Sequence, residues 1–360
     1  MRQSRSVFSR LSIFLTVLTV LLCAGIAGAA EKKVKWKLAM TWGSNAPPFT
    51  DAVTKMADMV NTMSGGSFTI RIDSANKHKS AFGILDMVKL GQYDMGHSAS
   101  YYWKGKDLAL LPLTTMPFGM TAAEQNAWFY YGGGMDLMQE AYAKHKVLSF
   151  PGGNTGQQMG GWFAKEINSL DDLKGLKMRI PGFAGEVMAA LGLTVTNIAP
   201  GELYMALERG TIDALEWVGP GMDINMGFHK VAPYYYTGWH EPATELQFLV
   251  NKKKFDKLSD KNKAILKTAM KLAAYDMYTQ NYHMSSEAWS KMEKEYPNIK
   301  VKTFPKEVMD AMKAANQKLL EEKSAANPML KKILDSQNAY LKKAREWTRM
   351  SDYSYLENNL

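Results

Sequence analysis

Hydrophobic and polar residues follow two alternating patterns along this 360-residue chain. Residues 34–40 begin with alternating apolar and polar positions, as a strand does, and residues 68–72 alternate again. Between them, residues 49–63 carry apolar side chains at helical spacing, and Gly65-Gly66 ends that pattern. The order strand, helix, strand predicts an α/β fold with a mostly parallel sheet.

The same order continues to about residue 251, after which helical spacing dominates. Strands are expected near 93–97 and at 147–150, 176–180, 212–218 and 246–251, and helices at 81–90, 183–191, 202–209, 261–295, 306–321 and 328–347. No low-complexity linker separates two halves of the chain. We therefore expect an α/β fold of two lobes, with a cleft between lobes that several crossings join. The expected boundaries are 31–155 with part of 246–300 for lobe I, 156–245 for lobe II, and 301–360 for a C-terminal helical segment.

The N-terminus has the three parts of a secretory signal peptide. These parts are the basic residues Arg2, Arg5 and Arg10, the apolar residues 11–26, and the small residues Ala27-Gly28-Ala29. The apolar run is short for a membrane span, which needs about 20 residues. We predict a signal peptide over residues 1–30 and a periplasmic location; the alternatives are an uncleaved anchor and lipid attachment at Cys23.

Composition narrows the possible chemistry. Cys23 is the only cysteine, so removal of the signal peptide would exclude disulfides, cysteine nucleophiles and thiolate metal sites. The formal charge of +9 comes from scattered lysines and arginines without a long basic run, which argues against nucleic-acid binding. A mildly positive surface would also help to attract anionic ligands.

Two charged residues stand near the expected carboxyl ends of strands, where open α/β sheets bind ligands. Arg179 lies between Met178 and Ile180, and its planar guanidinium suits a carboxylate in bidentate contact. Glu216 lies beside Trp217, and a carboxylate is a hard oxygen donor that suits calcium and similar ions. The alternatives are an internal salt bridge for Arg179, and for Glu216 either an exposed position or pairing with Arg179.

Three further segments offer binding groups. The glycine-rich residues 152–161 include Asn154, whose amide can donate and accept; the alternative is an ordinary turn. Residues 99–103 include Tyr101, which would give an apolar wall with a polar tip; the alternative is core packing. Glu241 and Gln247 are additional oxygen donors further along the chain.

Catalytic motifs are absent from the sequence, and we expect no enzyme activity. The six histidines are dispersed, and neither a zinc-protease, a serine-hydrolase nor a dinucleotide-binding motif occurs. A secreted metal-dependent enzyme acting on oxo acids would need a general base, and His240 beside Glu241 is the only candidate.

These segments together resemble the DctP-type extracytoplasmic solute receptors of tripartite ATP-independent periplasmic (TRAP) transporters. The resemblance spans about residues 34–347, and its most specific parts are residues 153–163, 173–179 and 210–220. Residues 153–163 and 210–220 look like the branch that binds 2-oxo or 2-hydroxy monocarboxylates beside a metal ion. An ATP-driven transporter's binding protein and a chemoreceptor partner are the alternatives within the broader class.

The resemblance implies roles for individual residues. Arg179 matches the arginine that clamps the substrate carboxylate, and Tyr101 lies where an aromatic ring meets the substrate. Gln158 and Glu216 match side-chain metal ligands, and Gln158 borders the substrate as well. Trp217 would contribute its carbonyl to the metal and pack on the ligand.

The branch commonly shows Trp-Trp-Glu-Pro-Gly where this chain has residues 239–243, and Leu-Glu where it has Leu246-Gln247. Either Glu241 or Gln247 is therefore expected to complete the metal shell. The resemblance further implies sodium or calcium as the cation, TRAP membrane subunits as partners, and a homodimer that residues 328–347 could form.

Overall fold

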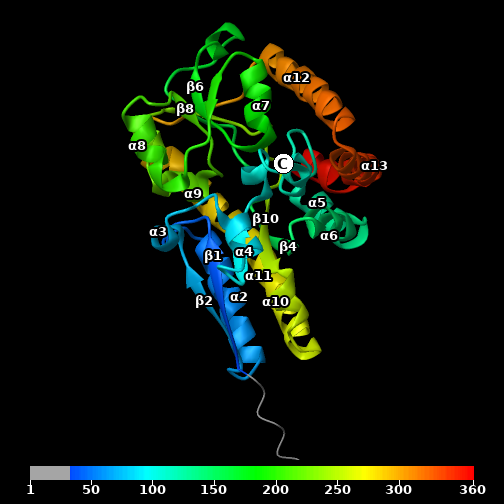
Figure 1. Cartoon of the computed structure of the whole chain (residues 1–360). Helices are drawn as coiled ribbons and strands as arrows, with labels where there is room; N and C mark the ends of the chain where they lie inside the picture. Colours follow the sequence, from blue (N-terminus) through cyan, green and yellow to red (C-terminus); the bar gives the residue numbers. More distant parts are fainter. Residues whose placement is uncertain (1–32) are drawn as a thin grey trace, which may run out of the picture.

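The computed structural model describes residues 33–360 as two lobes, each built on one β-sheet (Figure 1). The predicted signal peptide and Cys23 lie outside the described residues. Within residues 33–360, no helix is long and apolar enough to cross a membrane.

The sheet of the first lobe has five strands in the order β2-β1-β3-β10-β4. Its strands are β1 (Val34–Met40), β2 (Phe68–Asp73), β3 (Met95–Ser98), β4 (Val147–Asn154) and β10 (Glu245–Asn251). The three N-terminal strands are parallel, as the sequence predicts, but β10 runs antiparallel to both β3 and β4. The sheet is mixed because β10 enters from the second lobe after the chain has crossed between lobes.

The sheet of the second lobe has six shorter strands in the order β11-β9-β5-β8-β6-β7. Its strands are β5 (Gly161–Phe163), β6 (Lys177–Arg179), β7 (Thr194–Thr196), β8 (Ala214–Leu215), β9 (Tyr234–Tyr236) and β11 (Lys300–Lys302). The strand expected at 212–218 pairs only over β8. Asp223 accepts hydrogen bonds from the backbone N–H groups of Val218 (3.0 Å) and Gly219 (2.9 Å), which turns the chain away from the sheet.

Helices cover both sheets. The α-helices before the long helix α11 are α2 (Phe49–Met63), α3 (Ala75–His78), α4 (Ile84–Lys89), α5 (Ala122–Tyr131), α6 (Gly134–Ala143), α7 (Gly182–Ala190), α8 (Leu203–Glu208), α9 (Pro220–Met226) and α10 (Lys252–Asp256). Short 3₁₀ helices are η1 (Ser100–Trp103), η2 (Leu108–Leu113), η3 (Asp171–Leu173), η4 (Pro200–Glu202) and η5 (Phe228–Lys230). In α2, the buried positions Phe49, Val53, Met56 and Val60 are those that helical spacing places on one face.

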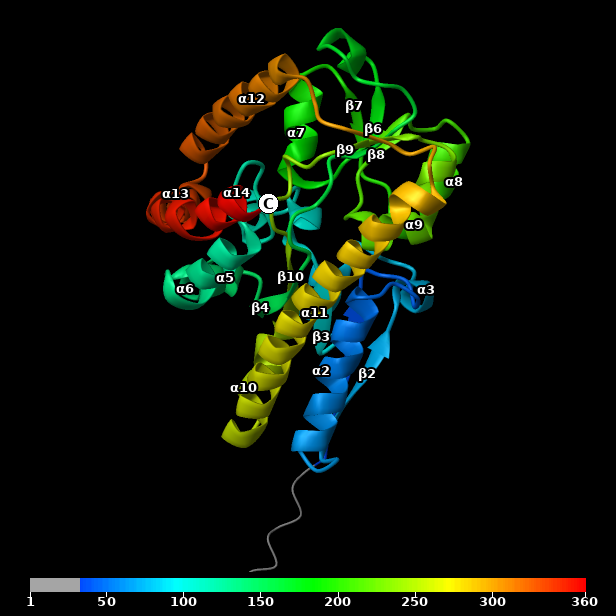
Figure 2. The ribbon, with the colours of Figure 1, turned by 180° about the vertical axis from the view of Figure 1, so that it is seen from behind.

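One long helix links the lobes. α11 (Asp260–Glu295) packs against α2 and β4 in the first lobe and against α9 in the second. Figure 2 shows it running diagonally from beside α10 to the upper lobe. Together with the connections from β4 to β5 and from β9 to β10, it gives the several crossings that the sequence predicts.

The C-terminal segment arches back from the second lobe to the first (Figures 1 and 2). It contains α12 (Lys306–Ala325), α13 (Pro328–Thr348), a π-helical turn η6 (Arg349–Tyr353) and α14 (Ser354–Asn359). α12 packs on α7, whereas α13 packs on α5, α6 and η2. This segment therefore contacts both lobes.

Candidate functional site

Arg179 lies at the end of β6 and is only 1% exposed. Its Nη1 donates to the backbone carbonyl of Glu216 (2.8 Å) and to the Glu216 carboxylate, and its Nε donates to the carbonyl of Ile198 (3.3 Å). Its Nη2 is buried without a hydrogen-bond partner among residues 33–360. The internal salt bridge considered from the sequence is therefore present, and one guanidinium nitrogen is left over for a ligand.

Glu216 meets Arg179 because their strands are neighbours. β6 and β8 are parallel with Arg179 opposite Leu215, so both charged residues emerge at the same edge of the sheet. Glu216 is 1% exposed, and an unpaired carboxylate buried to that extent would be strongly destabilising. The guanidinium provides the compensating charge.

Further polar side chains lie near Glu216. Gln158 donates through Nε2 to the hydroxyls of Thr155 (3.0 Å) and Thr244 (3.1 Å), whereas its buried Oε1 has no partner in the described chain. One ligand atom each from Glu216, His240 and Glu241 lies within 4.8 Å of the others. Carboxylates and imidazoles are common metal ligands in proteins, and an amide oxygen is a further hard donor, so these residues fit a metal ion.

Glu241 depends on its surroundings for its charge. Burial, and then the negative charge of Glu216, raise the pKa of Glu241 to about 7. Its carboxylate accepts a hydrogen bond from the hydroxyl of Thr244. A cation bound beside both carboxylates would favour their ionised forms, because an opposite charge lowers the pKa of an acid.

Aromatic rings from both lobes form the apolar wall of the site. The ring centroids of Trp42 and Phe49 are 4.4 Å apart, and those of Trp42 and Trp217 are 6.5 Å apart. These rings, with Tyr101, Tyr102, Thr155, Gln158, Arg179, Val218, Thr244 and Leu246, enclose a cavity of about 10 Å³. The cavity is narrow, so the wall suits a ligand with a small apolar part.

Sequence analysis missed Trp42 and the histidine that orients it. The buried His97 accepts a hydrogen bond from the Trp42 indole N–H at Nδ1 (2.9 Å), and its Nε2 donates to the carbonyl of Gly152 (2.9 Å). Burial lowers the pKa of His97 to about 4, so the ring is neutral at pH 7. The available signal was position: Trp42 follows β1 at the carboxyl end of that strand, as Phe49 follows a few residues later.

Two of the residues proposed for the site, Asn154 and Gln247, belong neither to the residues that enclose the cavity nor to the cluster around Glu216. Asn154 donates to Gln125 (2.8 Å) and Glu245 (3.0 Å) and accepts from the backbone N–H of Gly156 (2.8 Å), so it shapes the glycine-rich turn. Gln247 accepts from Tyr142 (2.6 Å) and donates to Ser100 and Leu113 inside the first lobe. The structure thus brings Glu241 to the Glu216 cluster, and it does not bring Asn154 or Gln247.

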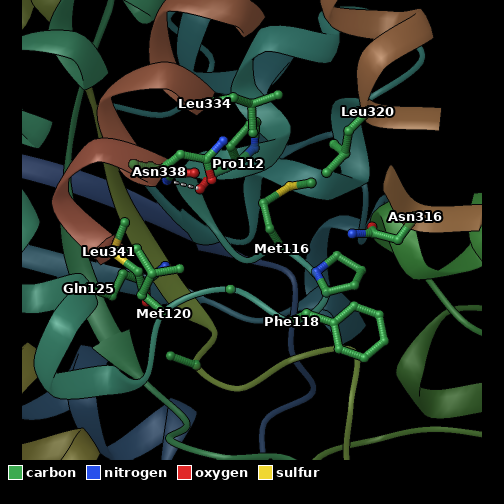
Figure 3. Close-up of a pocket in the computed structure, with 14 residues that line it drawn as sticks. Pro112, Met116, Phe118, Met120, Gln125, Asn316, Leu320, Leu334, Asn338 and Leu341 are labelled. Carbon is green, nitrogen blue, oxygen red and sulfur yellow. Dashed lines mark hydrogen bonds between the residues drawn. The ribbon is translucent and has the colours of Figure 1, made fainter. Parts of the chain in front are cut away.

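A larger cavity of about 160 Å³ lies between α12, α13 and the segment after η2 (Figure 3). Its labelled side chains include Met116, Phe118, Leu320 and Leu334, together with the amides of Asn316 and Asn338. No charged side chain lines it. Its lining among the described residues offers amides but no guanidinium and no carboxylate, and we place the candidate site at Arg179 and Glu216.

Known proteins resemble this chain over most of its length. The family model described as bacterial extracellular solute-binding protein, family 7, matches residues 38–327. A monocarboxylate 2-oxoacid-binding periplasmic protein of Nostoc sp. is 39% identical to this chain over 328 residues. The aligned residues cover 91% of this chain and 89% of the relative.

Two solved TRAP periplasmic solute-binding proteins have the same fold. The protein from Colwellia psychrerythraea, with bound calcium and pyruvate, is 63% identical, with a TM-score of 0.90 and coverage of 91% of this chain and 100% of that chain. The protein from Pseudoalteromonas atlantica, with bound sodium and pyruvate, is 62% identical, with a TM-score of 0.89 and coverage of 91% and 99%. The predicted α/β fold with two lobes is therefore confirmed.

Proposed function

The chain belongs to family 7 of the bacterial extracellular solute-binding proteins, the solute receptors of TRAP transporters, and from this premise we propose its ligand. It binds a small 2-oxo or 2-hydroxy monocarboxylate such as pyruvate, together with a calcium or sodium ion. One observation carries this proposal. The buried Arg179–Glu216 ion pair lies next to the oxygen donors Gln158 and Glu241, beside a narrow cavity lined by aromatic rings.

Arg179 would hold the ligand's carboxylate. Its Nη2 is a buried donor without a partner in the described chain, whereas its Nη1 is anchored on Glu216. Anchoring one nitrogen leaves the guanidinium oriented before the ligand arrives, which reduces the entropy lost on binding. Trp217, whose ring centroid is 5.7 Å from Cζ of Arg179, would pack against the ligand.

The cation would be held by Gln158, Glu216 and Glu241, with the carbonyl of Trp217 as a further donor. When bound, it supplies a positive centre that a carboxylate oxygen and a neighbouring 2-oxygen can both approach. A simple fatty acid lacks the 2-oxygen. The site would therefore discriminate between pyruvate and propionate, which have similar sizes.

Charge balance supports a divalent ion in particular. The buried groups are one guanidinium, two carboxylates and the ligand's carboxylate. A divalent cation makes their sum neutral, whereas sodium leaves one negative charge in a buried site, which is unfavourable. We therefore expect calcium to bind more tightly than sodium when both glutamates are ionised.

Closure of the two lobes would couple ligand binding to transport. Trp42, Phe49 and Tyr101 come from the first lobe, and Arg179 and Trp217 from the second. A ligand contacts all of them only when the lobes are closed, so it favours the closed form by its additional contacts there. The TRAP membrane subunits would recognise that form.

We further propose that the protein is periplasmic, exported through a signal peptide at residues 1–30, and releases its ligand unchanged. Incubation with pyruvate should leave the pyruvate NMR spectrum unaltered over hours.

A second copy of the chain would pack on the C-terminal helices, where Trp347 and Met350 are 72% and 73% exposed.

The proposal is tested by calorimetry on purified mature protein. Pyruvate and lactate should bind in the presence of calcium or sodium, binding should weaken after chelation and removal of sodium, and propionate should bind at least ~100-fold more weakly. Equal affinity for pyruvate and propionate would contradict the cation-bridged site. So would a pyruvate affinity that is the same with and without calcium and sodium.

A further inference from the structure

His240 belongs to the buried cluster with Glu216 and Glu241, yet neither the clamp nor the apolar wall uses it. It is 0% exposed, and its Nε2 lies 3.3 Å from Oε2 of Glu216. Its Nδ1 has no hydrogen-bond partner within the part of the chain that the structure describes. A buried imidazole usually satisfies both ring nitrogens, so this one has unused capacity.

A hydrogen bond to Glu216 explains the position of His240 only weakly. The Nε2–Oε2 distance of 3.3 Å exceeds the usual range of about 2.7–3.2 Å for N–H···O bonds. In contrast, one donor atom each from Glu216, His240 and Glu241 lies within 4.8 Å of the other two. Adjacent ligands of a tetrahedral metal ion are about 3.3–3.9 Å apart for bond lengths of about 2.0–2.4 Å. The Nε2–Oε2 distance of 3.3 Å therefore fits two ligands of one cation at least as well as it fits a hydrogen bond.

The donor types also differ from those of an all-oxygen calcium site. Two carboxylates and one imidazole make a mixed nitrogen and oxygen set, which suits zinc, cobalt, iron or manganese. Gln158 adds an amide oxygen whose lone pairs are free within the described residues. The departure from the Trp-Trp-Glu-Pro-Gly pattern of the resembled branch places this imidazole at position 240.

We propose that His240 donates a nitrogen to the cation of this site, which therefore binds borderline divalent transition-metal ions through His240 in addition to hard cations. This inference rests on the proposed function, because it concerns the same cation that bridges to the ligand. His240 is a metal ligand in this view, and the carboxylate clamp is left to Arg179.

The test compares wild-type protein with His240→Asn, which exchanges the imidazole for an amide of smaller size that offers an oxygen. Calorimetry with saturating pyruvate should show zinc affinity falling at least ~10-fold in H240N, while calcium affinity changes less than ~3-fold. His283→Asn is the matched control, because His283 is exposed on α11 and any weak surface binding would be shared.

A second measurement does not depend on a variant that folds. Manganese-loaded wild-type protein, studied by pulsed EPR at one equivalent, should show coupling to an imidazole nitrogen, and calcium should compete the signal away. Absence of that coupling, or equal loss of zinc and calcium affinity in H240N, overturns the role of His240. If wild-type protein still binds pyruvate and calcium after one of these results, the proposed function stands without the role of His240. If wild-type protein binds neither pyruvate nor calcium, both proposals fail.

Discussion

Lys104 of the first lobe and Glu186 of the second form a salt bridge of 2.8 Å beside the ligand site. Lys104 directly follows η1, which carries Tyr101, and Glu186 lies in α7, which begins after Arg179. Lys104 also donates to the carbonyl of Gly182 (2.9 Å), and Lys323 of α12 pairs with Glu186 at 3.1 Å. The two bonds of Lys104 join the lobes, so separation of the lobes would break them.

Replacement of Lys104 by Met should therefore weaken pyruvate binding without touching the ligand. The two side chains are 33% and 29% exposed, so solvent screening limits the effect to about 1 kcal/mol, or roughly fivefold in Kd. The increase in Kd should arise mainly from a faster dissociation of pyruvate, measured by stopped flow. Lys302→Met is the control, because the Lys302–Glu166 pair is similarly exposed but lies within one lobe; equal effects of both variants would argue against a role in closure.

Arg179→Lys should separate the clamp from the fold. A lysine keeps the positive charge beside Glu216 but lacks the second directed donor of the guanidinium. Loss of a charged hydrogen bond to the ligand corresponds to about 1.5–3 kcal/mol, so pyruvate affinity should fall roughly 10- to 100-fold. Thermal unfolding should stay close to wild type. Arg179→Met, in comparison, leaves Glu216 buried and unpaired and should destabilise the protein by about 3–5 kcal/mol. Unchanged affinity in Arg179→Lys would exclude a ligand contact that depends on Nη2.

Phe49→Leu should broaden the ligand range. Phe49 is 2% exposed, and its ring centroid lies 4.4 Å from that of Trp42 and 6.2 Å from that of Trp217. A smaller side chain enlarges the cavity, at a cost in stability of about 1–2 kcal/mol. We expect 2-oxoacids with longer side chains, such as 2-oxobutyrate and 2-oxovalerate, to gain affinity relative to pyruvate in calorimetric competition. Val53→Ala, which shortens a core residue of the same helix away from the cavity, should leave the ratio unchanged.

His97 should make the fold sensitive to acid. Its pKa is lowered from 6.5 to about 4 in the folded protein, so the folded state holds the neutral ring while the unfolded chain takes up a proton first. The neutral ring therefore contributes stability that is present above pH 6.5 and is lost as pH falls toward about 4, at most about 3 kcal/mol. His97→Gln keeps a donor and an acceptor for Gly152 and Trp42 but does not titrate. Urea unfolding at several pH values should show the free energy of unfolding falling less in H97Q than in wild type over this range; parallel curves would contradict the assignment.

Much of this molecule follows from short stretches of sequence. The alternation in residues 34–40 and the helical spacing in residues 49–63 specify their elements because period 2 and period 3.6 each bury one face. Arg179 and Glu216 were predicted as site residues because charged residues at the ends of apolar strands are unusual. Gly219-Pro220 after Glu216 marked the end of the strand, although the paired part proved shorter than expected.

Tertiary structure decided which of the oxygen donors share a site. Glu241 and Gln247 are equivalent in sequence terms, yet Glu241 lies beside Glu216 while Gln247 bonds to Tyr142 in the first lobe. The bond between His97 and Trp42 and the bridge between Lys104 and Glu186 join residues far apart in the chain. Local patterns record which face of an element is buried, but the choice of partner across a cleft depends on how complete lobes pack. For that reason the sequence by itself determined the strands and their charged ends, and only the folded chain determined which of the polar side chains lie together.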